Sequence, residues 1–207
     1  MNTSRFLRLF LFAVLVWNTD ALVQTSDKKN APPRPEKWAV KLESTNLFNC
    51  YRITTNLYRG AQPSAKGMAE LKSMGVRTVL NLRGFHSDQN VATGTGLKLS
   101  RLHMEPWHAE NADVVEFLKL VANTNNLPLY IHCQRGADRT GMLCAMYRVV
   151  VCDWPRQDAI EEMMEGGFRF NPMWRNLVRY IERADIDELR RRAGLPPYEK
   201  EKLKPAE

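Results

Sequence analysis

The stretch Leu129-Tyr130-Ile131-His132-Cys133-Gln134-Arg135-Gly136-Ala137-Asp138-Arg139-Thr140-Gly141 decides the fold. Its first residues form an apolar run that predicts a buried strand, and the apolar residues after Arg139 predict a helix. Five residues separate Cys133 from Arg139. A strand that turns through a short loop straight into a helix is typical of an α/β domain.

The loop that begins at Cys133 has the composition of an anion site. A loop closing on a helix N-terminus turns backbone N–H groups inward, and the helix dipole adds partial positive charge. Gly136 permits turns that a side chain would hinder, and Gly141 permits close packing. The same field stabilises a thiolate, so we expect Cys133 to be a nucleophile. Arg139 can hold two phosphate oxygens and stabilise the charge of phosphoryl transfer.

The other residues of this stretch are assigned supporting roles. Thr140 can donate a hydroxyl hydrogen bond to the Cys133 sulfur, which would help the thiolate depart from a phosphocysteine intermediate. We interpret His132 as an organiser of the loop rather than a base. The competing interpretation is a buried cysteine at a strand end with an incidental arginine, which would not require Arg-Thr-Gly at this spacing. The predicted phosphate-binding loop consists of Gln134, Arg135, Gly136, Ala137, Asp138 and Arg139.

Strand and helix patterns alternate along the rest of the chain. This alternation predicts an α/β domain with a mostly parallel central sheet. Ser64 is a predicted helix N-cap. The expected strands are 51–53, 57–59, 76–82, 97–104 and 128–132, and the expected helices are 65–74, 113–122, 140–151, 155–165, 172–184 and 187–193.

His-Cys-x5-Arg-Thr-Gly after a strand resembles the signature of cysteine-based protein tyrosine and dual-specificity phosphatases. The upstream segments 56–64 (Asn-Leu-Tyr-Arg-Gly-Ala-Gln-Pro-Ser) and 75–83 (Gly-Val-Arg-Thr-Val-Leu-Asn-Leu-Arg) also resemble that family, most of all its compact bacterial and plant-and-fungal atypical members. The resemblance covers about Trp38 to Arg183. It implies a three-layer fold, a phosphocysteine mechanism on Cys133, and no metal or other cofactor.

The family's mechanism needs a general acid, which is usually a loop aspartate, and three groups compete for this role. Asp113 comes first because its residue type matches, although Asp113-x-x-Glu116 before an apolar run is also an ordinary helix cap. Glu110 is second and His108 third. Asn111 lies near the position where some atypical members carry their aspartate, and an amide cannot act as an acid. We expect Asp138 to bond the loop backbone or an upstream arginine, and it is a further candidate acid.

The rim of the loop bears on the choice of substrate. Arg135 adds positive charge, as in relatives that act on inositol phosphates, whereas Gln134 and Ala137-Asp138 replace further basic residues of those relatives. We therefore expect hydrolysis of phosphotyrosine-type monoesters, and of phosphoserine and phosphothreonine in the dual-specificity interpretation. The alternative is an inositol polyphosphate or phosphoinositide phosphatase with the same mechanism. By default, Arg59 and Arg83 form surface salt bridges, although either could contact the loop.

Other classes of function remain open. A non-catalytic phosphate-binding module would keep Arg139 but usually lose the nucleophile. A sulfurtransferase typically has a shorter anion loop, and a thiol–disulfide enzyme requires Cys-x-x-Cys, which is absent from the sequence. The four histidines lack metal-ligand spacing. The basic tail lacks a recognition motif, so we expect a phosphorylated protein or a small phosphate as the partner and no nucleic acid.

The N-terminal residues predict export. An apolar run extends from Phe6 to Trp17, with Arg5 before it and only Arg8 interrupting it. Together with the small and polar residues that follow up to Ala21, this pattern is typical of a signal peptide. It is short for a membrane span, so we expect an exported protein, periplasmic or extracellular, that is anchored only if the signal is uncleaved. The net charge of +7 favours anionic partners. The predicted organisation is a signal over 1–21, a flexible leader over 22–37, a phosphatase-like catalytic domain over 38–193 and a polar tail over 194–207. Oligomeric state and the pairing of the other three cysteines, Cys50, Cys144 and Cys152, stay open.

Overall fold

The structure, a computed structural model, describes residues 34–197, and the compact unit in this range begins at Glu36. The predicted signal peptide lies outside the described residues, as do most of the predicted leader and tail. In the described part of the chain, no helix combines the length and the apolar character needed to cross a membrane.

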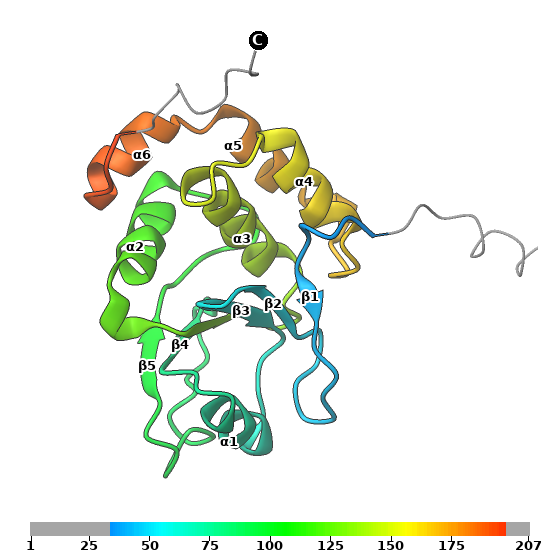
Figure 1. Cartoon of the computed structure of the whole chain (residues 1–207), viewed down its shortest axis with the longest axis vertical. Helices are drawn as coiled ribbons and strands as arrows, with labels where there is room; N and C mark the ends of the chain where they lie inside the picture. The colour runs from blue at the N-terminus through cyan, green and yellow to red at the C-terminus, as the bar shows by residue number, and fades with distance from the viewer. Residues whose placement is uncertain (1–33, 198–207) are drawn as a thin grey trace, which may run out of the picture. The chain divides into compact units, whose positions relative to one another are not determined.

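Six strands form one mixed sheet (Figure 1). The sheet order is β1-β2-β3-β6-β4-β5, in which β3, β6, β4 and β5 run parallel and β1 and β2 add an antiparallel edge. The mostly parallel sheet predicted from the sequence is confirmed. The strand bounds are β1 Val40–Lys41, β2 Tyr51–Thr54, β3 Leu57–Gly60, β4 Thr78–Asn81, β5 Lys98–Arg101 and β6 Leu129–His132.

Helices cover both faces of the sheet, which gives three layers (Figure 1). Helix α1 (Ala65–Ser73) lies on one face, and its predicted cap is present, since the Ser64 side chain accepts a hydrogen bond from the Gly67 N–H. The segment predicted as a helix over 172–184 is a 3₁₀ turn followed by α5. The elements on the other face are α2 Asn111–Ala122, α3 Asp138–Val150, α4 Arg156–Glu165, η2 Pro172–Trp174, α5 Arg175–Arg183 and α6 Ile186–Ala193, and the short turn η1 Thr124–Asn126 follows α2.

Alternate residues of the parallel strands supply two hydrophobic cores. In β4, Val79 packs into the cluster that contains α1 residues, and Leu80 packs into the larger cluster that contains α2 and α3 residues. Helix α3 is the central helix of that larger cluster, because every residue from Thr140 to Val150 is buried. A helix buried on all sides cannot shift without opening the core, so it holds its first residues in a fixed place.

A buried ion pair ties α3 to α4. The Arg148 Nε lies 2.8 Å from the Glu162 carboxylate, and Glu162 also accepts the Ala39 N–H at 2.5 Å. The Arg148 guanidinium stacks 4.1 Å from the Trp154 ring and donates to the Lys37 carbonyl. The chain just before β1 is therefore held against the helices by the same buried pair.

Glu162→Ala should destabilise the protein strongly, because it removes the buried carboxylate that pairs with the Arg148 charge and accepts the Ala39 N–H. We expect a loss of about 3–5 kcal/mol in the free energy of unfolding. Glu161→Ala, at the exposed neighbouring position, should change it by less than about 0.5 kcal/mol. Denaturant unfolding followed by circular dichroism measures both variants. Equal effects would contradict a stabilising role for the pair.

Candidate active site

The predicted loop lies where three parallel strands end together. Gly60, His132 and Asn81 occupy matching positions at the ends of β3, β6 and β4. Ligands of α/β proteins bind in the crevice beyond such strand ends. From His132 the chain enters the loop at Cys133, which is 3% exposed, and α3 begins five residues later at Asp138. The strand, the short loop and the buried helix therefore follow one another along the chain as the sequence predicted.

Gly136 lets the loop pack directly on the end of β3. Its φ is +66°, and a Cβ atom there would lie 2.2 Å from the carbonyl carbon and oxygen of Gly60. Any side chain at this position would therefore collide with backbone. The Gln62 N–H also donates to the Gln134 carbonyl at 3.3 Å, so the segment after β3 and the loop hold each other in register.

Arg59 supports the loop from below. Its side chain is buried, and its Nη2 donates to the carbonyl oxygens of Gly136 at 2.6 Å and Ala137 at 3.3 Å. The guanidinium also stacks 3.8 Å from the Phe168 ring. The default expectation of a surface salt bridge for Arg59 was wrong, because the sheet buries the end of β3. The carbonyls of Gly136 and Ala137 are thereby held toward the buried guanidinium.

Arg139 is the second residue of α3 and is anchored through one nitrogen. Its Nη1 donates to the Met104 carbonyl at 3.1 Å and to the Leu82 carbonyl at 3.3 Å. The other guanidinium nitrogens make no hydrogen bond to residues 34–197. The guanidinium is thereby oriented by the segments that follow β4 and β5. Its two other nitrogens remain to hold phosphate oxygens.

His132 organises the loop together with Asp88, a residue that the sequence analysis missed. The imidazole is completely buried, and its Nε2 lies 2.8 Å from the Asp88 carboxylate. Its Nδ1 faces the Cys133 carbonyl at 3.1 Å. Both neighbours of the imidazole are acceptors, and the contact at Nε2 ties His132 to a buried carboxylate. No sequence motif marks Asp88, since it lies 44 residues before His132.

Two asparagines connect the loop to neighbouring segments by hydrogen bonds. The Asn49 side chain donates to the carbonyls of Arg135 at 2.9 Å and Phe168 at 3.0 Å. The Asn171 N–H donates to the Asp138 carboxylate at 2.8 Å. The expected bond from Asp138 to the loop backbone or an upstream arginine is therefore wrong, because its carboxylate holds the segment after α4.

Thr140 does not make the predicted bond to sulfur. Its hydroxyl is buried and has no hydrogen-bond partner in the described part of the chain. The hydroxyl belongs to the first turn of the enclosed helix α3, so its position is set by packing rather than by the sulfur of Cys133.

The remaining cysteines differ from Cys133 in their surroundings. All four cysteines are free thiols. Burial raises the pKa of Cys50 to about 12 and that of Cys144 to about 11, so both stay protonated at neutral pH. Burial also raises the pKa of Cys152. These three thiols are poor nucleophiles, which leaves the loop cysteine as the candidate.

The candidate acids gather at the start of α2. This helix begins at Asn111, two residues earlier than predicted, so Asp113 lies inside the first turn and not at the cap. Burial raises the pKa of Asp113, and a hydrogen bond with the Glu110 backbone partly offsets that rise. A raised pKa keeps the carboxyl protonated to higher pH, as a general acid requires. Glu110 is exposed and paired with His108 at 2.9 Å.

None of these candidate acids is bonded to Cys133 or Arg139 among residues 34–197. They are connected to the loop indirectly, because Arg139 holds Met104 at the start of the segment that carries them. The Asn111 side chain is occupied by the Tyr180 hydroxyl at 2.7 Å. The structure thus places Cys133 and Arg139 at the two ends of one short loop, and the candidate acids around the start of α2.

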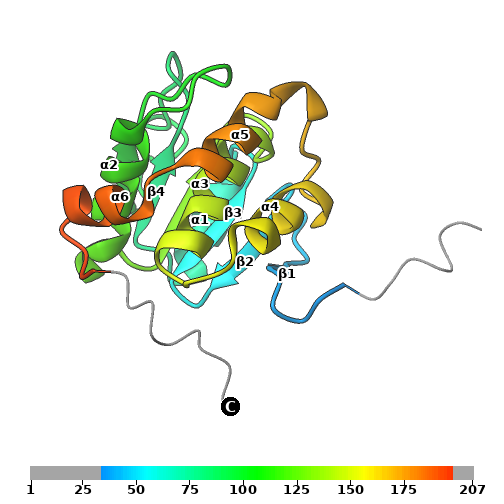
Figure 2. The same cartoon turned by 90° about the horizontal axis from the view of Figure 1, so that it is seen from above.

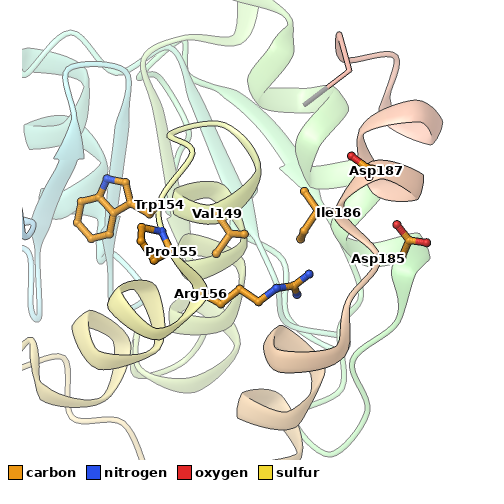
Figure 3. Close-up of a pocket in the computed structure, with 7 residues that line it drawn as sticks. All are labelled: Val149, Trp154, Pro155, Arg156, Asp185, Ile186 and Asp187. Atoms are coloured by element: carbon orange, nitrogen blue, oxygen red, sulfur yellow. The ribbon is translucent and has the colours of Figure 1, made fainter. Parts of the chain in front are cut away.

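A pocket of about 370 Å³ lies elsewhere, between the end of α3 and the starts of α4 and α6 (Figure 3). Its Arg156 donates to the carbonyls of Ile181 at 2.6 Å and Ala184 at 2.7 Å, so it caps the end of α5. None of the loop residues lines this pocket. We assign it no part in the chemistry.

Asp88→Ala should weaken the phosphate loop although it changes no loop residue, because His132 would lose its buried acceptor. We expect the free energy of unfolding to fall by about 2–4 kcal/mol and kcat/KM on an aryl phosphate to fall at least about tenfold. Asp88→Asn retains an acceptor and should lose less of both. Gln89→Ala, on the exposed neighbour in the same loop, is the matched control. Wild-type stability and turnover in Asp88→Ala would show that the pair is dispensable.

Comparisons with known proteins agree with this geometry. A family model described as "DSP-PTPase phosphatase fused to NAD+ Kinase" matches residues 36–170. The dual specificity protein phosphatase TpbA of Pseudomonas aeruginosa is 37% identical over 166 residues, which cover 78% of this chain and 73% of TpbA. The inositol diphosphatase DSP3 of Arabidopsis thaliana is 26% identical over 151 residues, 69% of this chain and 72% of that protein.

A solved structure of TpbA has a TM-score of 0.70 and 31% identity, and covers 78% of this chain and 99% of its own. A second structure holds a cysteine-to-serine variant of TpbA in complex with phosphotyrosine. Since the family model covers more than half of this chain and TpbA matches most of it, the chain belongs to the dual-specificity family of cysteine-based phosphatases and is a phosphatase.

Proposed function

We propose that this phosphatase hydrolyses phosphotyrosine-type monoesters, and phosphoserine and phosphothreonine esters more slowly, through a phosphocysteine on Cys133. The observation that carries the proposal is that the buried Cys133 begins a loop whose Gly136 and Ala137 carbonyls accept from Arg59. At the other end of that loop, two guanidinium nitrogens of Arg139 have no hydrogen-bond partner among residues 34–197. This arrangement suits a tetrahedral dianion that is attacked by sulfur.

The reaction has two steps. The Cys133 sulfur attacks phosphorus, so that a P–S bond forms and the bond to the leaving oxygen breaks, while a general acid gives that oxygen its proton. Water then attacks the phosphocysteine, the P–S bond breaks with its electrons returning to sulfur, and the same carboxylate takes the proton of the water. Arg139 and the loop N–H groups stabilise the equatorial oxygens in both steps. Asp113 is our first choice for the acid, with Glu110 second.

Relatives support both substrate classes. A TpbA structure holds phosphotyrosine, which favours the main proposal. DSP3 is named an inositol diphosphatase, and the exposed Arg135 of this chain would suit a second phosphate. An inositol polyphosphate is therefore the second candidate. Gln134 and Asp138 make the loop less basic than such a substrate favours.

Cys133→Ser should abolish hydrolysis of p-nitrophenyl phosphate and of a phosphotyrosyl peptide, with a loss of at least about 10³-fold in kcat. Arg139→Lys should lose a comparable factor in kcat/KM, because an ammonium cannot grip two oxygens. Cys152→Ser, at the far end of α3, is the control and should retain wild-type turnover. Side-by-side assays with the peptide and an inositol polyphosphate rank the two substrates. Turnover by Cys133→Ser would overturn the mechanism.

Asp113→Asn should lower kcat about 10²–10⁴-fold on an alkyl or phenyl phosphate, whose leaving group needs a proton. It should cost little with an activated leaving group such as p-nitrophenolate. Because the raised pKa of Asp113 sets the pH above which the acid loses its proton, the alkaline limb of the wild-type profile should vanish in the variant. Glu116→Gln, exposed on the same helix, is the control. Wild-type rates on phenyl phosphate would restrict Asp113 to helix stability and move the test to Glu110→Gln.

A further inference from the structure

Four large apolar side chains are exposed on separate loops at the strand ends where Cys133 lies. Soluble proteins seldom expose several such side chains together unless they contact a partner. They are Phe85 at 97% exposure, Met173 at 75%, Phe48 at 72% and Trp107 at 64%. We call these four residues the apolar rim.

Phe48 and Met173 are connected to the phosphate loop by short paths. The Phe48 carbonyl accepts the Ala61 N–H just after β3, and the next residue, Asn49, bonds the Arg135 carbonyl. Met173 follows Asn171 by two residues, and the Asn171 N–H bonds the Asp138 carboxylate. Both side chains therefore lie on segments that directly border the loop.

Phe85 and Trp107 lie on the segments that follow β4 and β5. Phe85 comes three residues before Asp88, the partner of His132, and Trp107 comes three residues after Met104, the partner of Arg139. In Figure 2 the loops between β4 and α2 and the segment that leads into α5 stand along the same upper edge of the domain. The loops that carry Phe85, Trp107 and Met173 thus lie along one edge of the domain.

Positive charge accompanies the rim. Arg135, Arg169 and Arg175 are exposed, and none of them is paired with an acid within residues 34–197. Beside Trp107 lies a groove of about 460 Å³. Two arginines, Arg179 and Arg183, and one acid, Asp185, contribute to its lining. A partner that fits this surface must offer apolar groups and negative charge together.

An inositol polyphosphate offers only the second of these, because it has no apolar side chain to bury. We propose that the apolar rim binds the polypeptide around a phosphorylated residue, and that it selects segments with apolar and acidic residues on both sides of that residue. This proposal rests on the proposed function, because phosphate seated above Cys133 brings the flanking chain onto the rim. Burial of the rim side chains adds binding energy, and the unpaired arginines meet the acidic residues.

The test compares two phosphotyrosyl peptides of equal length, one with leucine and glutamate around the phosphotyrosine and one with serine and lysine. Wild type should prefer the first by about tenfold or more in kcat/KM. In the double variant Phe85→Ser, Met173→Ser, the ratio of kcat/KM for the first peptide to that for p-nitrophenyl phosphate should fall about tenfold. The control is the double variant Val40→Ser, Val151→Ser, which changes exposed apolar residues away from the rim and should keep the ratio.

The outcomes separate this inference from the proposed function. Equal use of the two peptides by wild type, or an unchanged ratio in the rim variant, would overturn the inference while leaving the phosphatase mechanism intact. An equal fall in kcat/KM of the rim variant on inositol hexakisphosphate and on the peptide would also overturn the inference, since inositol hexakisphosphate has no apolar side chain for the rim to bind. Sedimentation of wild type, but not of the rim variant, with phosphatidylglycerol vesicles alongside an unchanged peptide ratio would assign the rim to lipid instead. If wild type hydrolyses neither the peptides nor p-nitrophenyl phosphate, the proposed function itself is wrong.

Discussion

The site depends on the hydrogen bonds that the Arg59 guanidinium donates to the carbonyls of Gly136 and Ala137. A loop of consecutive peptide groups binds an anion only if its N–H groups converge, and the carbonyls must then find donors elsewhere. Arg59 supplies these donors from inside the sheet at 2.6 and 3.3 Å, and the Phe168 ring covers its other side. The buried cation also adds positive charge beside the loop. One side chain therefore contributes both to the shape of the loop and to its electrostatics.

The architecture around this contact divides rigid from adaptable parts. The strand ends and the buried helix α3 fix Cys133 and Arg139, since neither element can move without disturbing the core. Of the acid candidates, His108 and Glu110 lie on the segment between β5 and α2, whereas Asp113 lies in the first turn of α2. Phosphate binding at Arg139 would act on that segment through Met104, because one guanidinium would bond both. Cys133 is thus held by the sheet and α3, whereas the candidate acids depend on how the segment before α2 is placed.

Local patterns explain what the sequence could predict. The strand, loop and helix around Cys133 are contiguous, and the cap at Ser64 is read from its own first turn. Asp88, Asn49 and Arg59 act on the loop from 44 to 86 residues away, and no spacing rule connects such positions. The start of α2 was misplaced because Glu110 occupies the cap without a capping bond, whereas Asp113 has the better composition for one. The contacts that shape the site are therefore the ones that only tertiary structure reveals.

The phosphate loop does not by itself decide which substrate is hydrolysed. Relatives of this chain are named as protein phosphatases and as inositol diphosphatases. The surface around the loop is the part of the protein that would meet the rest of the substrate. In this chain that surface carries exposed aromatic side chains, and also arginines that have no acidic partner within residues 34–197. The Asp138 carboxylate accepts the Asn171 N–H, and its negative charge makes the loop less basic. Such a division lets the loop select phosphate and the surrounding segments select the molecule that carries it.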